Sequence, residues 1–268
     1  MKYILFGTGD YYNRFHHWFK NRDVVAILDN DKSKQGKTLD GYPAISPDDI
    51  TKYSFDAVVV LSFYIKEMKA QLLELGVSEN KIYHFYDLHE LFCKEANTSD
   101  HTMGNEIFSP SKSILLLSHD LSLGGPALAL YHAAVALKKS GYEVAFASMI
   151  DGDLRNKVEE AFIRVIIDER LQVSTMNELA WTLNYDLIIC NTINYHIFLS
   201  DRNNRIPVIW WLHDSPFFYE GIKSERLTNM DMTNMKIVSV GSVPKGAMMK
   251  YRSDVTIEDL IYGVSNGV

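Results

Sequence analysis

The sequence predicts an α/β protein with two parallel-sheet domains in tandem. In both halves, short apolar runs that suit strands buried on both faces alternate with segments of helical periodicity. A glycine-containing loop follows the first predicted strand of each half, at residues 7–9 and 124–125. A stretch of small, polar and turn-forming residues, 93–111, separates the halves. We therefore expect domains at residues 1–92 and 112–268, joined by a linker at 93–111.

The composition is that of a globular protein, and it limits the possible classes of function. The 268 residues allow one large or two ordinary domains, and 47% of them are apolar. A net charge of −7 argues against nucleic acid as the main partner, although a local basic patch could still contact a membrane surface. Cys93 and Cys190 suggest neither a disulfide framework nor a zinc site, so the reducing cytoplasm is the expected location. No apolar run has the length of a signal peptide or a membrane span.

The expected elements of the first domain alternate between strands and helices. Ser46-Pro47 is a typical helix start, because serine caps a helix and proline suits its first position. The stretch around Gly36 and Gly41 is expected to form turns. The expected strands are 2–6, 23–28, 57–61 and 81–83, and the expected helices are about 11–19, a short one from 47, and 66–75.

The first domain opens with the pattern of a dinucleotide-binding fold. Gly7 and Gly9 follow the first strand, and Asp29 follows the second, about twenty positions later. In that pattern the glycines cradle a phosphate and the carboxylate holds a ribose, so these three are candidate cofactor-binding residues. Tyr12 occupies the position of a third glycine, which argues against NAD binding. A solvated turn is a slightly better interpretation of Asp29 than a ribose contact.

Several motifs also give the first domain a family resemblance. L-F-G-T-G-D at 5–10, I-L-D-N-D-x-x-K-Q-G-K at 27–37, G-Y-P-A-I-S-P-D-D-I at 41–50 and D-A-V-V-V-L-S at 56–62 resemble the small Rossmann-like domain at the front of bacterial polysaccharide-biosynthesis proteins. In some of those proteins the equivalent module binds a nucleotide sugar. We expect a targeting or regulatory module here, with nucleotide-sugar binding as the second interpretation.

The second domain opens with a strand, a glycine loop and a helix. The apolar run 114–117 predicts a buried strand, and Gly124-Gly125 precede a segment, 127–139, that is rich in the helix formers Ala and Leu. Pro126 suits the first helical position. Glycine lets a backbone approach a ligand, and the unpaired N–H groups of a helix start attract phosphate or sugar hydroxyls. The alternative is a plain strand-to-helix turn, since the spacing is not G-x-G-x-x-G.

Later strands of the second domain are expected to deliver polar residues to one sheet edge. The strand ends carry Asn191 after 186–190, His213-Asp214 after 207–212 and Ser242 after 236–240. Ligands bind at the carboxyl edge of open α/β sheets, so we expect these side chains to converge near Gly124-Gly125. The remaining expected elements are strands at 142–147 and 164–167, helices at 154–161 and 243–251, and a short helix that follows a capping box at 175–178.

The motifs of the second domain resemble an enzyme family. S-H-D-L-S-L-G-G-P-A-L-A-L at 118–130, W-W-L-H-D-S-P at 210–216, I-V-S-V-G-S-V-P-K-G-A-M-M-K-Y at 237–251 and the terminal N-G-V resemble the N-terminal domain of family-4, GT-B-fold glycosyltransferases. The resemblance covers almost all of 112–268 and implies that this domain is the N-terminal half of a GT-B fold. The C-terminal, donor-binding domain of that family is absent from the sequence, so we expect that the chain does not transfer sugar by itself.

This resemblance implies a reaction and its participants. The family transfers sugar from a nucleotide sugar, UDP- or GDP-linked, to a saccharide acceptor with retained anomeric configuration. We expect a role in the synthesis of capsule, exopolysaccharide or another cell-surface glycan in a bacterium, without a metal or a tightly bound cofactor. A lipid-linked saccharide acceptor would bring the protein to the inner face of the membrane as a peripheral protein. The oligomeric state is left open.

Two other classes of function compete with sugar transfer. The first is a non-catalytic module that binds a nucleotide sugar or docks to a partner enzyme. The second is an NAD-linked oxidoreductase acting on sugar nucleotides, against which Tyr12 and the lack of a Tyr-x-x-x-Lys pair both count.

Within the resemblance, His213 and Asp214 are the candidate catalytic residues. A neutral imidazole can donate a hydrogen bond to a sugar hydroxyl, whereas a packing histidine is the plainer interpretation of His213. Asp214 would orient His213 or accept an acceptor hydroxyl, or it would merely cap a helix. The candidate substrate-binding residues are Gly124, Gly125, Asn191 and Ser242; a tight turn, a turn-forming asparagine and a helix cap are the respective structural alternatives.

Other polar and aromatic residues of the second domain are expected to be structural. His119 is interpreted as a loop residue. One of Trp210 and Trp211 is expected in the core, because consecutive strand residues point to opposite faces. The aromatic residues at 217–219 would form either a lip for sugar stacking or the anchor of an exposed loop.

Overall fold

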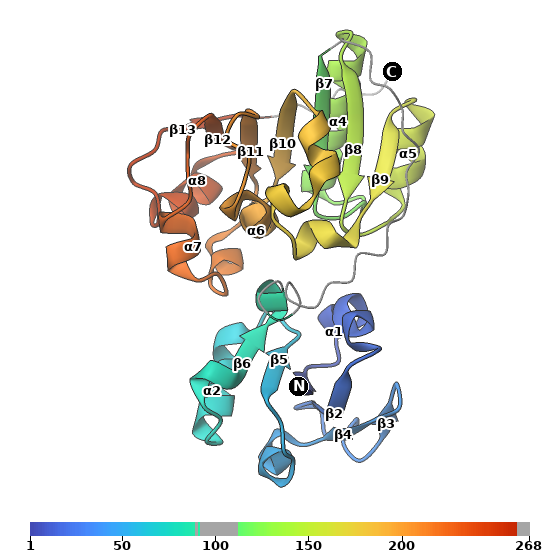
Figure 1. Ribbon diagram of the computed structural model, residues 1–268, viewed down its shortest axis with the longest axis vertical. Coiled ribbons are helices and arrows are strands. Elements are labelled where there is room, and N and C mark those ends of the chain that lie inside the picture. Colours follow the sequence, from blue (N-terminus) through green and yellow to red (C-terminus); the bar gives the residue numbers. More distant parts are fainter. Residues whose placement is uncertain (89–90, 92–111, 262–268) are drawn as a thin grey trace. The chain divides into compact units, whose positions relative to one another are not determined.

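The computed structural model describes residues 1–88, 91 and 112–261. The chain divides into two compact units, Met1–Leu91 and Phe92–Val268, and each is built around a sheet of its own (Figure 1). Both sheets are mainly parallel and Rossmann-like, which confirms the predicted fold class. The expected linker at 93–111 and the terminal Asn266-Gly267-Val268 lie outside the described residues.

The first unit alternates strands with helices around a sheet in the order β3-β4-β2-β1-β5-β6, counted over its described residues. Neighbouring strands are parallel, apart from the antiparallel pair β3–β4. Its elements are β1 (Lys2–Phe6), α1 (Asp10–Phe15), β2 (Asp23–Leu28), β3 (Thr38–Leu39), β4 (Tyr42–Ile45), β5 (Ala57–Val60), α2 (Ile65–Glu74) and β6 (Ile82–His84), with 3₁₀ helices at His16–Phe19, Pro47–Lys52, Glu79–Lys81 and Phe85–Asp87.

The stretch around Gly41, expected to form turns, contains the hairpin β3–β4. Asp40 and Gly41 join its strands with φ angles of 50° and 86°. Two left-handed residues are what a two-residue hairpin turn requires, and Asp-Gly is a strong sequence signal for it. The expected turns are present, but the two short strands beside them were not expected. The expected helix at 11–19 is also split, because α1 ends at Phe15 and the chain continues as a 3₁₀ helix.

The second unit has a parallel sheet in the order β13-β12-β11-β10-β7-β8-β9, again counted over its described residues (Figure 1). Its elements are β7 (Ser113–Ser118), α4 (Gly125–Lys139), β8 (Glu143–Ser148), α5 (Leu154–Glu160), β9 (Arg164–Ile167), β10 (Leu187–Asn191), α6 (His196–Ser200), β11 (Val208–Leu212), α7 (Ser224–Thr228), β12 (Met235–Ser239), α8 (Ser242–Met249) and β13 (Ile257–Asp259), with 3₁₀ helices at Glu169–Gln172, Met176–Glu178, Ala180–Asn184, Ile193–Tyr195 and Pro216–Tyr219.

The core of the second unit covers both faces of its sheet. Every residue of β7 is buried, as its unbroken apolar run predicts for a central parallel strand. Trp210 and Trp211 on β11 are both buried, although only one of them was expected in the core. Trp211 packs in the cluster formed with α4 and α5. Trp210 belongs to the other face, where its indole N–H donates to the carbonyl of Thr192 at 2.7 Å.

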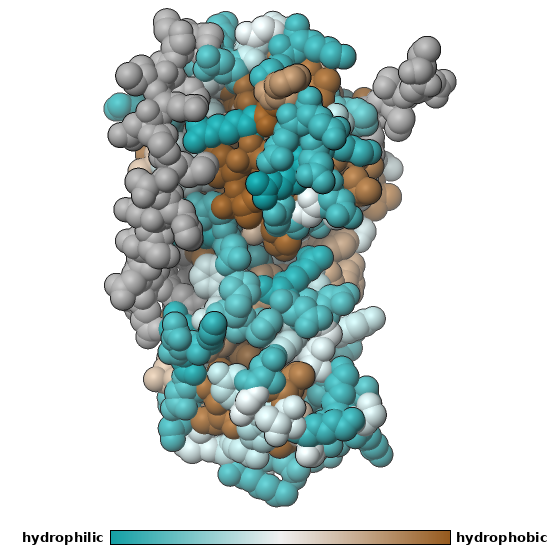
Figure 2. Space-filling model, turned by 90° about the vertical axis from the view of Figure 1, so that its right-hand side faces the viewer, coloured by the Kyte–Doolittle hydropathy of each residue, from teal (hydrophilic) through white to brown (hydrophobic). Residues whose placement is uncertain are grey.

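The surface that Figure 2 shows mixes hydrophilic and hydrophobic side chains on both units. Phe162 is the most exposed of the large hydrophobic residues described, at 85%. It follows α5 with φ 55°, and the bonds from Phe162 N–H to Glu159 and from Ile163 N–H to Val158 form a Schellman motif. Glycine is the usual residue at this position. Among the described residues, no helix is both long enough and apolar enough to cross a membrane.

Candidate functional site

The candidate site lies where the strand order of the second sheet reverses. From β7 the chain adds β8 and β9 on one side, and it then returns to place β10, β11, β12 and β13 on the other side. Such a reversal opens a crevice at the carboxyl ends of the two central strands, here β7 and β10, and ligands of open α/β sheets bind there. The glycine loop follows β7 directly.

The glycine loop begins α4 at this reversal. Gly124 is the N-cap and Gly125 is the first helical residue, so Pro126 occupies the second position rather than the first. The N–H of Gly124 donates to Ser122 Oγ at 3.3 Å. A Cβ on Gly124 would lie 3.1 Å from that oxygen, so a larger residue would push against Ser122. The loop is therefore both a tight turn and an uncapped helix start.

Gly152, which was not predicted as a site residue, packs against the glycine loop. A Cβ at Gly152 would lie 2.5 Å from the carbonyl oxygen of Leu121, a distance that real Cβ atoms do not adopt. Leu121 also exchanges backbone hydrogen bonds with this second loop: its N–H donates to Ile150 at 3.1 Å and its carbonyl accepts from Leu154 at 2.9 Å. The loop between β8 and α5 thus braces the loop between β7 and α4.

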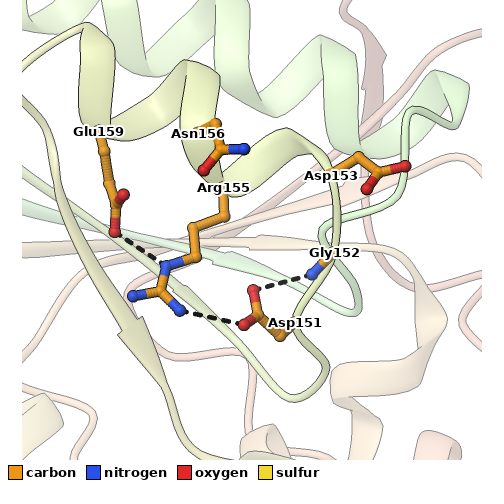
Figure 3. A pocket seen from close by; sticks show the side chains of 6 residues that line it. All are labelled: Asp151, Gly152, Asp153, Arg155, Asn156 and Glu159. Atoms are coloured by element: carbon orange, nitrogen blue, oxygen red, sulfur yellow. Dashed lines mark hydrogen bonds and ion pairs between the residues drawn. The ribbon is translucent and has the colours of Figure 1, made fainter.

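An open hollow of about 550 Å³ lies on this bracing loop (Figure 3). The guanidinium of Arg155 points between two carboxylates, at 3.1 Å from Asp151 and 2.8 Å from Glu159. Asp151 also accepts from the N–H of Gly152 at 2.9 Å. Arg155 is the one cation among the residues that line the hollow, and it is already paired. The lining residues therefore offer no free positive charge to a phosphate. The polar residues predicted for the site lie on other loops of the same edge.

Asn191, the last residue of β10, contacts the glycine loop directly. It is fully buried, and its side-chain amide donates to the carbonyl of Pro126 at 2.7 Å. Its Oδ1 is a buried acceptor without a partner among the described residues. Asn191 thereby ties the end of β10 to the start of α4.

His213 and Asp214 follow β11 but have different environments. His213 is partly exposed, and its ring centroid lies 4.8 Å from that of Trp211. Asp214 is buried, and its carboxylate accepts from the N–H of Ile193 at 2.7 Å. That bond braces the turn after β10, where Thr192 adopts φ 74°. The geometry suits His213 for contact with a ligand and Asp214 for holding the turn.

Burial shifts both ionisation equilibria toward the neutral form. Burial, together with positive charge on His119, lowers the pKa of His213 to about 4, so its imidazole is neutral at pH 7. Burial raises the pKa of Asp214 to about 6, although the backbone N–H of Ile193 and charge on His119 oppose the shift. Asp214 is therefore an easily protonated carboxylate beside a neutral histidine.

His119, interpreted from the sequence as a loop residue, belongs to the same cluster. Its charge acts on both His213 and Asp214, and its Nε2 lies 3.2 Å from Asp120 Oδ2. One sequence signal could have found it: β7 and β11 are both followed by His-Asp, and both strands neighbour β10. In the part of the chain that the structure describes, no three His, Cys, Asp or Glu residues are grouped to hold a metal ion.

Ser242 lies at the start of α8, after β12. Gly241 is the N-cap of α8, so Ser242 does not cap this helix as its alternative interpretation expected. Ser242 is exposed, and it is separated from the glycine loop by the ends of β10 and β11 in the sheet order. The cluster around the glycine loop therefore consists of Asn191, His213, Asp214 and the unexpected His119.

In the first unit, Asp29 is buried and hydrogen-bonded to neighbouring residues, which contradicts its interpretation as part of a solvated turn. It is 8% exposed and accepts from the N–H of Asp31 at 2.8 Å, from Lys34 Nζ at 3.3 Å, and from both the backbone and the hydroxyl of Thr8. Burial alone would raise its pKa, but these donors hold the pKa of Asp29 below its ordinary value. Its carboxylate is thus engaged by the chain itself.

The two glycines and Tyr12 of the first unit also have structural roles or no close contacts. Gly7 has φ 99°, and a Cβ there would lie 3.1 Å from the carbonyl of Leu61, so this position requires glycine. Gly9 is the N-cap of α1 and meets no such contact. Tyr12 is buried, and its hydroxyl donates to Asp40 Oδ2 at 2.8 Å. The bulky residue therefore ties α1 to the β3–β4 turn.

Together, the sheets and the cluster of polar strand ends define a Rossmann-like α/β protein with a candidate site at the carboxyl edge of its second sheet. Residues 110–241 match the family model described as Glycosyl-transferase family 4. The second unit is therefore a glycosyltransferase domain of that family, which confirms the resemblance given above for the second domain. Residues 1–83 match the model described as C2185-like, N-terminal.

Two solved structures resemble the chain. HepE from Anabaena, in complex with UDP and glucose, is 18% identical over 57% of this chain and 45% of its own, with a TM-score of 0.44. A Listeria monocytogenes protein assigned as a UDP-N-acetylglucosamine 2-epimerase is 12% identical over 94% of this chain and 65% of its own, with a TM-score of 0.32. This chain thus spans less than two thirds of either one. No curated protein sequence matches it.

Proposed function

We propose that the second unit contributes the acceptor side of an enzyme that transfers a sugar from a nucleotide sugar to a saccharide. The match of residues 110–241 to the Glycosyl-transferase family 4 model carries this proposal. It falls on the unit in which a glycine loop, a buried asparagine and two histidines meet at the carboxyl edge of the sheet. In open α/β sheets, that edge is where a ligand binds.

The residues of the site have separate roles in this proposal. His213, neutral at pH 7 because its pKa is lowered to about 4, donates a hydrogen bond to a sugar hydroxyl. Gly124 and Gly125 have no side chains, so the sugar or its phosphate can approach the start of α4 closely. Asp214 is a positioning residue, because its carboxylate holds the backbone of Ile193.

The family resemblance also supports the finer features of the proposed reaction. The donor is a UDP- or GDP-linked sugar, and the anomeric configuration is retained. The product is part of a capsule, an exopolysaccharide or another bacterial cell-surface glycan. A lipid-linked acceptor would place the reaction at the inner face of the membrane.

Replacing His213 tests the proposed function. We would measure nucleoside diphosphate release and saccharide product with UDP- and GDP-linked sugars and lipid-linked saccharide acceptors, in an enzyme that includes the donor-binding domain of the family. His213→Ala is expected to lower turnover by about 100-fold, the usual effect of removing a preorganised hydrogen-bond donor from an active site. His132→Ala, within α4, is the matched control and should leave turnover unchanged.

Other results would contradict the proposal. Unchanged turnover in His213→Ala would remove His213 from the mechanism. Nucleotide-sugar binding without turnover, even when the donor-binding domain is included, would instead favour the non-catalytic module that binds a nucleotide sugar or docks to a partner.

A further inference from the structure

The ends of β7 and β11 carry the same two residues. His119-Asp120 follows β7 and His213-Asp214 follows β11, and in the sheet these strands lie on either side of β10. The two pairs therefore reach the same edge of the sheet. They also interact, because His119 in its protonated form would lower the pKa of both His213 and Asp214. The proposed function assigns no role to His119.

Asp120 fixes the orientation and the tautomer of His119. The Nε2 of His119 lies 3.2 Å from Asp120 Oδ2, and Asp120 is 8% exposed. Burial alone would raise the pKa of Asp120, but His119 and Ser122 hold it well below the usual range, so the carboxylate is charged. A charged carboxylate can only accept, so the proton of a neutral His119 must be on Nε2.

This tautomer leaves an unused acceptor at the site. With Nε2 protonated, Nδ1 of His119 carries a lone pair. Within the described residues Nδ1 is buried and has no hydrogen-bond partner, although the side chain as a whole is 22% exposed. A buried polar atom without a partner is costly and therefore unusual in a native protein. A ligand that donates a hydrogen bond to Nδ1 would remove that cost.

The pair is also linked to the glycine loop. The other oxygen of Asp120 accepts from the Ser122 hydroxyl at 2.8 Å and from the Ser122 N–H at 3.2 Å. Ser122 Oγ in turn accepts from the N–H of Gly124 at 3.3 Å. One chain of hydrogen bonds thus runs from the start of α4 through Asp120 to His119. The orientation of His119 is set by the loop that would contact the ligand.

We propose that His119 is a second ligand-binding histidine, whose Nδ1 accepts a hydrogen bond from a hydroxyl group of the bound sugar. Asp120 is its positioning residue. The chemistry selects a hydroxyl, because the oxygens of an ionised phosphate cannot donate to Nδ1. His213 and His119 would then face the sugar from two strand ends. This inference rests on the proposed function, because it assumes that the sugar binds at the carboxyl edge of the second sheet.

Nitrogen-15 NMR of the histidine rings in the full chain tests the proposal without an activity assay. Without ligand, and at a pH high enough for the ring to be neutral, His119 should show a protonated Nε2 and an unprotonated Nδ1. Addition of glucose or UDP-glucose should shift the Nδ1 resonance, whereas inorganic phosphate should not. A shift with glucose would indicate a site for a free sugar. A shift with UDP-glucose, but with neither UDP nor glucose, would assign the hydroxyl to the sugar of a nucleotide sugar, and both results support the proposal.

Variants measure the strength of the contact. His119→Ala should weaken sugar binding by about 3- to 10-fold, the effect of one hydrogen bond. His119→Asn, which keeps an acceptor near the Nδ1 position, should restore part of it. Asp120→Asn should allow both tautomers of His119, because the amide can donate as well as accept. If Asp120 only stabilised the loop, this substitution would leave the tautomer unchanged. His132→Ala is the control and should bind sugar as the wild-type protein does.

The outcomes separate this inference from the proposed function. If sugar shifts the resonances of His213 but not those of His119, the inference is wrong and the proposed site stands. If sugar shifts neither histidine, both fail. A wild-type His119 with its proton on Nδ1, or an equal response to phosphate and glucose, would overturn the inference even if a variant failed to fold.

Discussion

His213 and Asp214 are adjacent residues whose ionisation equilibria are shifted in opposite senses. The pKa of His213 is lowered from 6.5 to about 4, so between these values the unfolded chain binds a proton that the folded protein does not. His213 therefore opposes folding as the pH falls through this range. The pKa of Asp214 is raised from 3.8 to about 6, so there the folded protein binds the extra proton. Asp214 therefore favours folding as the pH falls.

Two variants should separate these opposing contributions. His213→Gln, compared with the wild-type protein, is expected to gain stability between pH 6.5 and pH 4, because the variant avoids protonating a buried imidazole. Asp214→Asn is expected to lose stability relative to wild type over pH 6 to pH 4, since it lacks the relief that protonation gives. The measurement is urea unfolding followed by tryptophan fluorescence at several pH values. Differences that do not change with pH would contradict the assigned shifts.

Part of the candidate site could be predicted residue by residue. Asn191, His213 and Asp214 were named because each follows an apolar run, and strand ends carry the polar residues of a parallel sheet. His119 was missed because Ser118 separates it from the apolar run 114–117, so that it was interpreted as part of the loop. Gly152 could not be found, since its closest contact is with Leu121, and only the fold brings these two residues together.

Two loops act together as one element at the edge of the second sheet. The loop after β8 contacts the loop after β7 through Gly152 and Leu121, with backbone hydrogen bonds on both sides of the contact. Because the partner atom is a backbone carbonyl, it cannot move aside as the end of a flexible side chain could. The start of α4 therefore depends on a residue that is about thirty positions away in the sequence.

Gly152→Ala should disturb the site as well as the stability of the second unit. A methyl group 2.5 Å from the Leu121 carbonyl forces a backbone shift, which we expect to cost about 1–3 kcal/mol in the free energy of unfolding. Backbone amide resonances of residues 119–125 should move. Gly246→Ala in α8 is the control: its Cβ meets nothing within 4 Å, and alanine should stabilise that helix by about 0.5–1 kcal/mol. Equal effects of the two substitutions would contradict the contact.

Secondary structure was predictable where periodicity and length were clear. The strands at 2–6, 23–28 and 164–167 have the expected bounds, and most other predicted strands and helices begin or end within a few residues of their predicted limits. The short strands β3, β4 and β13 were not expected, because turn-forming or charged residues surround each of them. They are stabilised as strands by pairing with a longer neighbour in the sheet.

Each unit of the molecule has a hydrophobic core made of its own residues. Leu116 lies in the core of the second unit and Ile4 in the core of the first, and both are fully buried. The sequence indicated two such cores, because each half contains its own set of apolar strands. It could not say which side chains share a core, since that depends on the order of the strands in each sheet.

Truncation of one residue from each core tests this division. Leu116→Ala is expected to cost about 2–5 kcal/mol and to lower hydrogen-exchange protection in peptides from residues 112–261. Ile4→Ala, the matched variant, should lower protection in peptides from residues 1–88 by a similar amount. A variant that lowered protection equally in both sets of peptides would contradict two separate cores.

The central position of β7 has a consequence for synthesis on the ribosome. β8 follows β7 closely, so these two strands can pair soon after they emerge. The other neighbour is β10, and Ser113 at the start of β7 bonds Asp186, which is 73 positions later. Until that segment is translated, one side of this buried strand lacks its partner. The nascent second unit therefore exposes an apolar, unpaired strand for several seconds, the interval in which a chaperone would bind it.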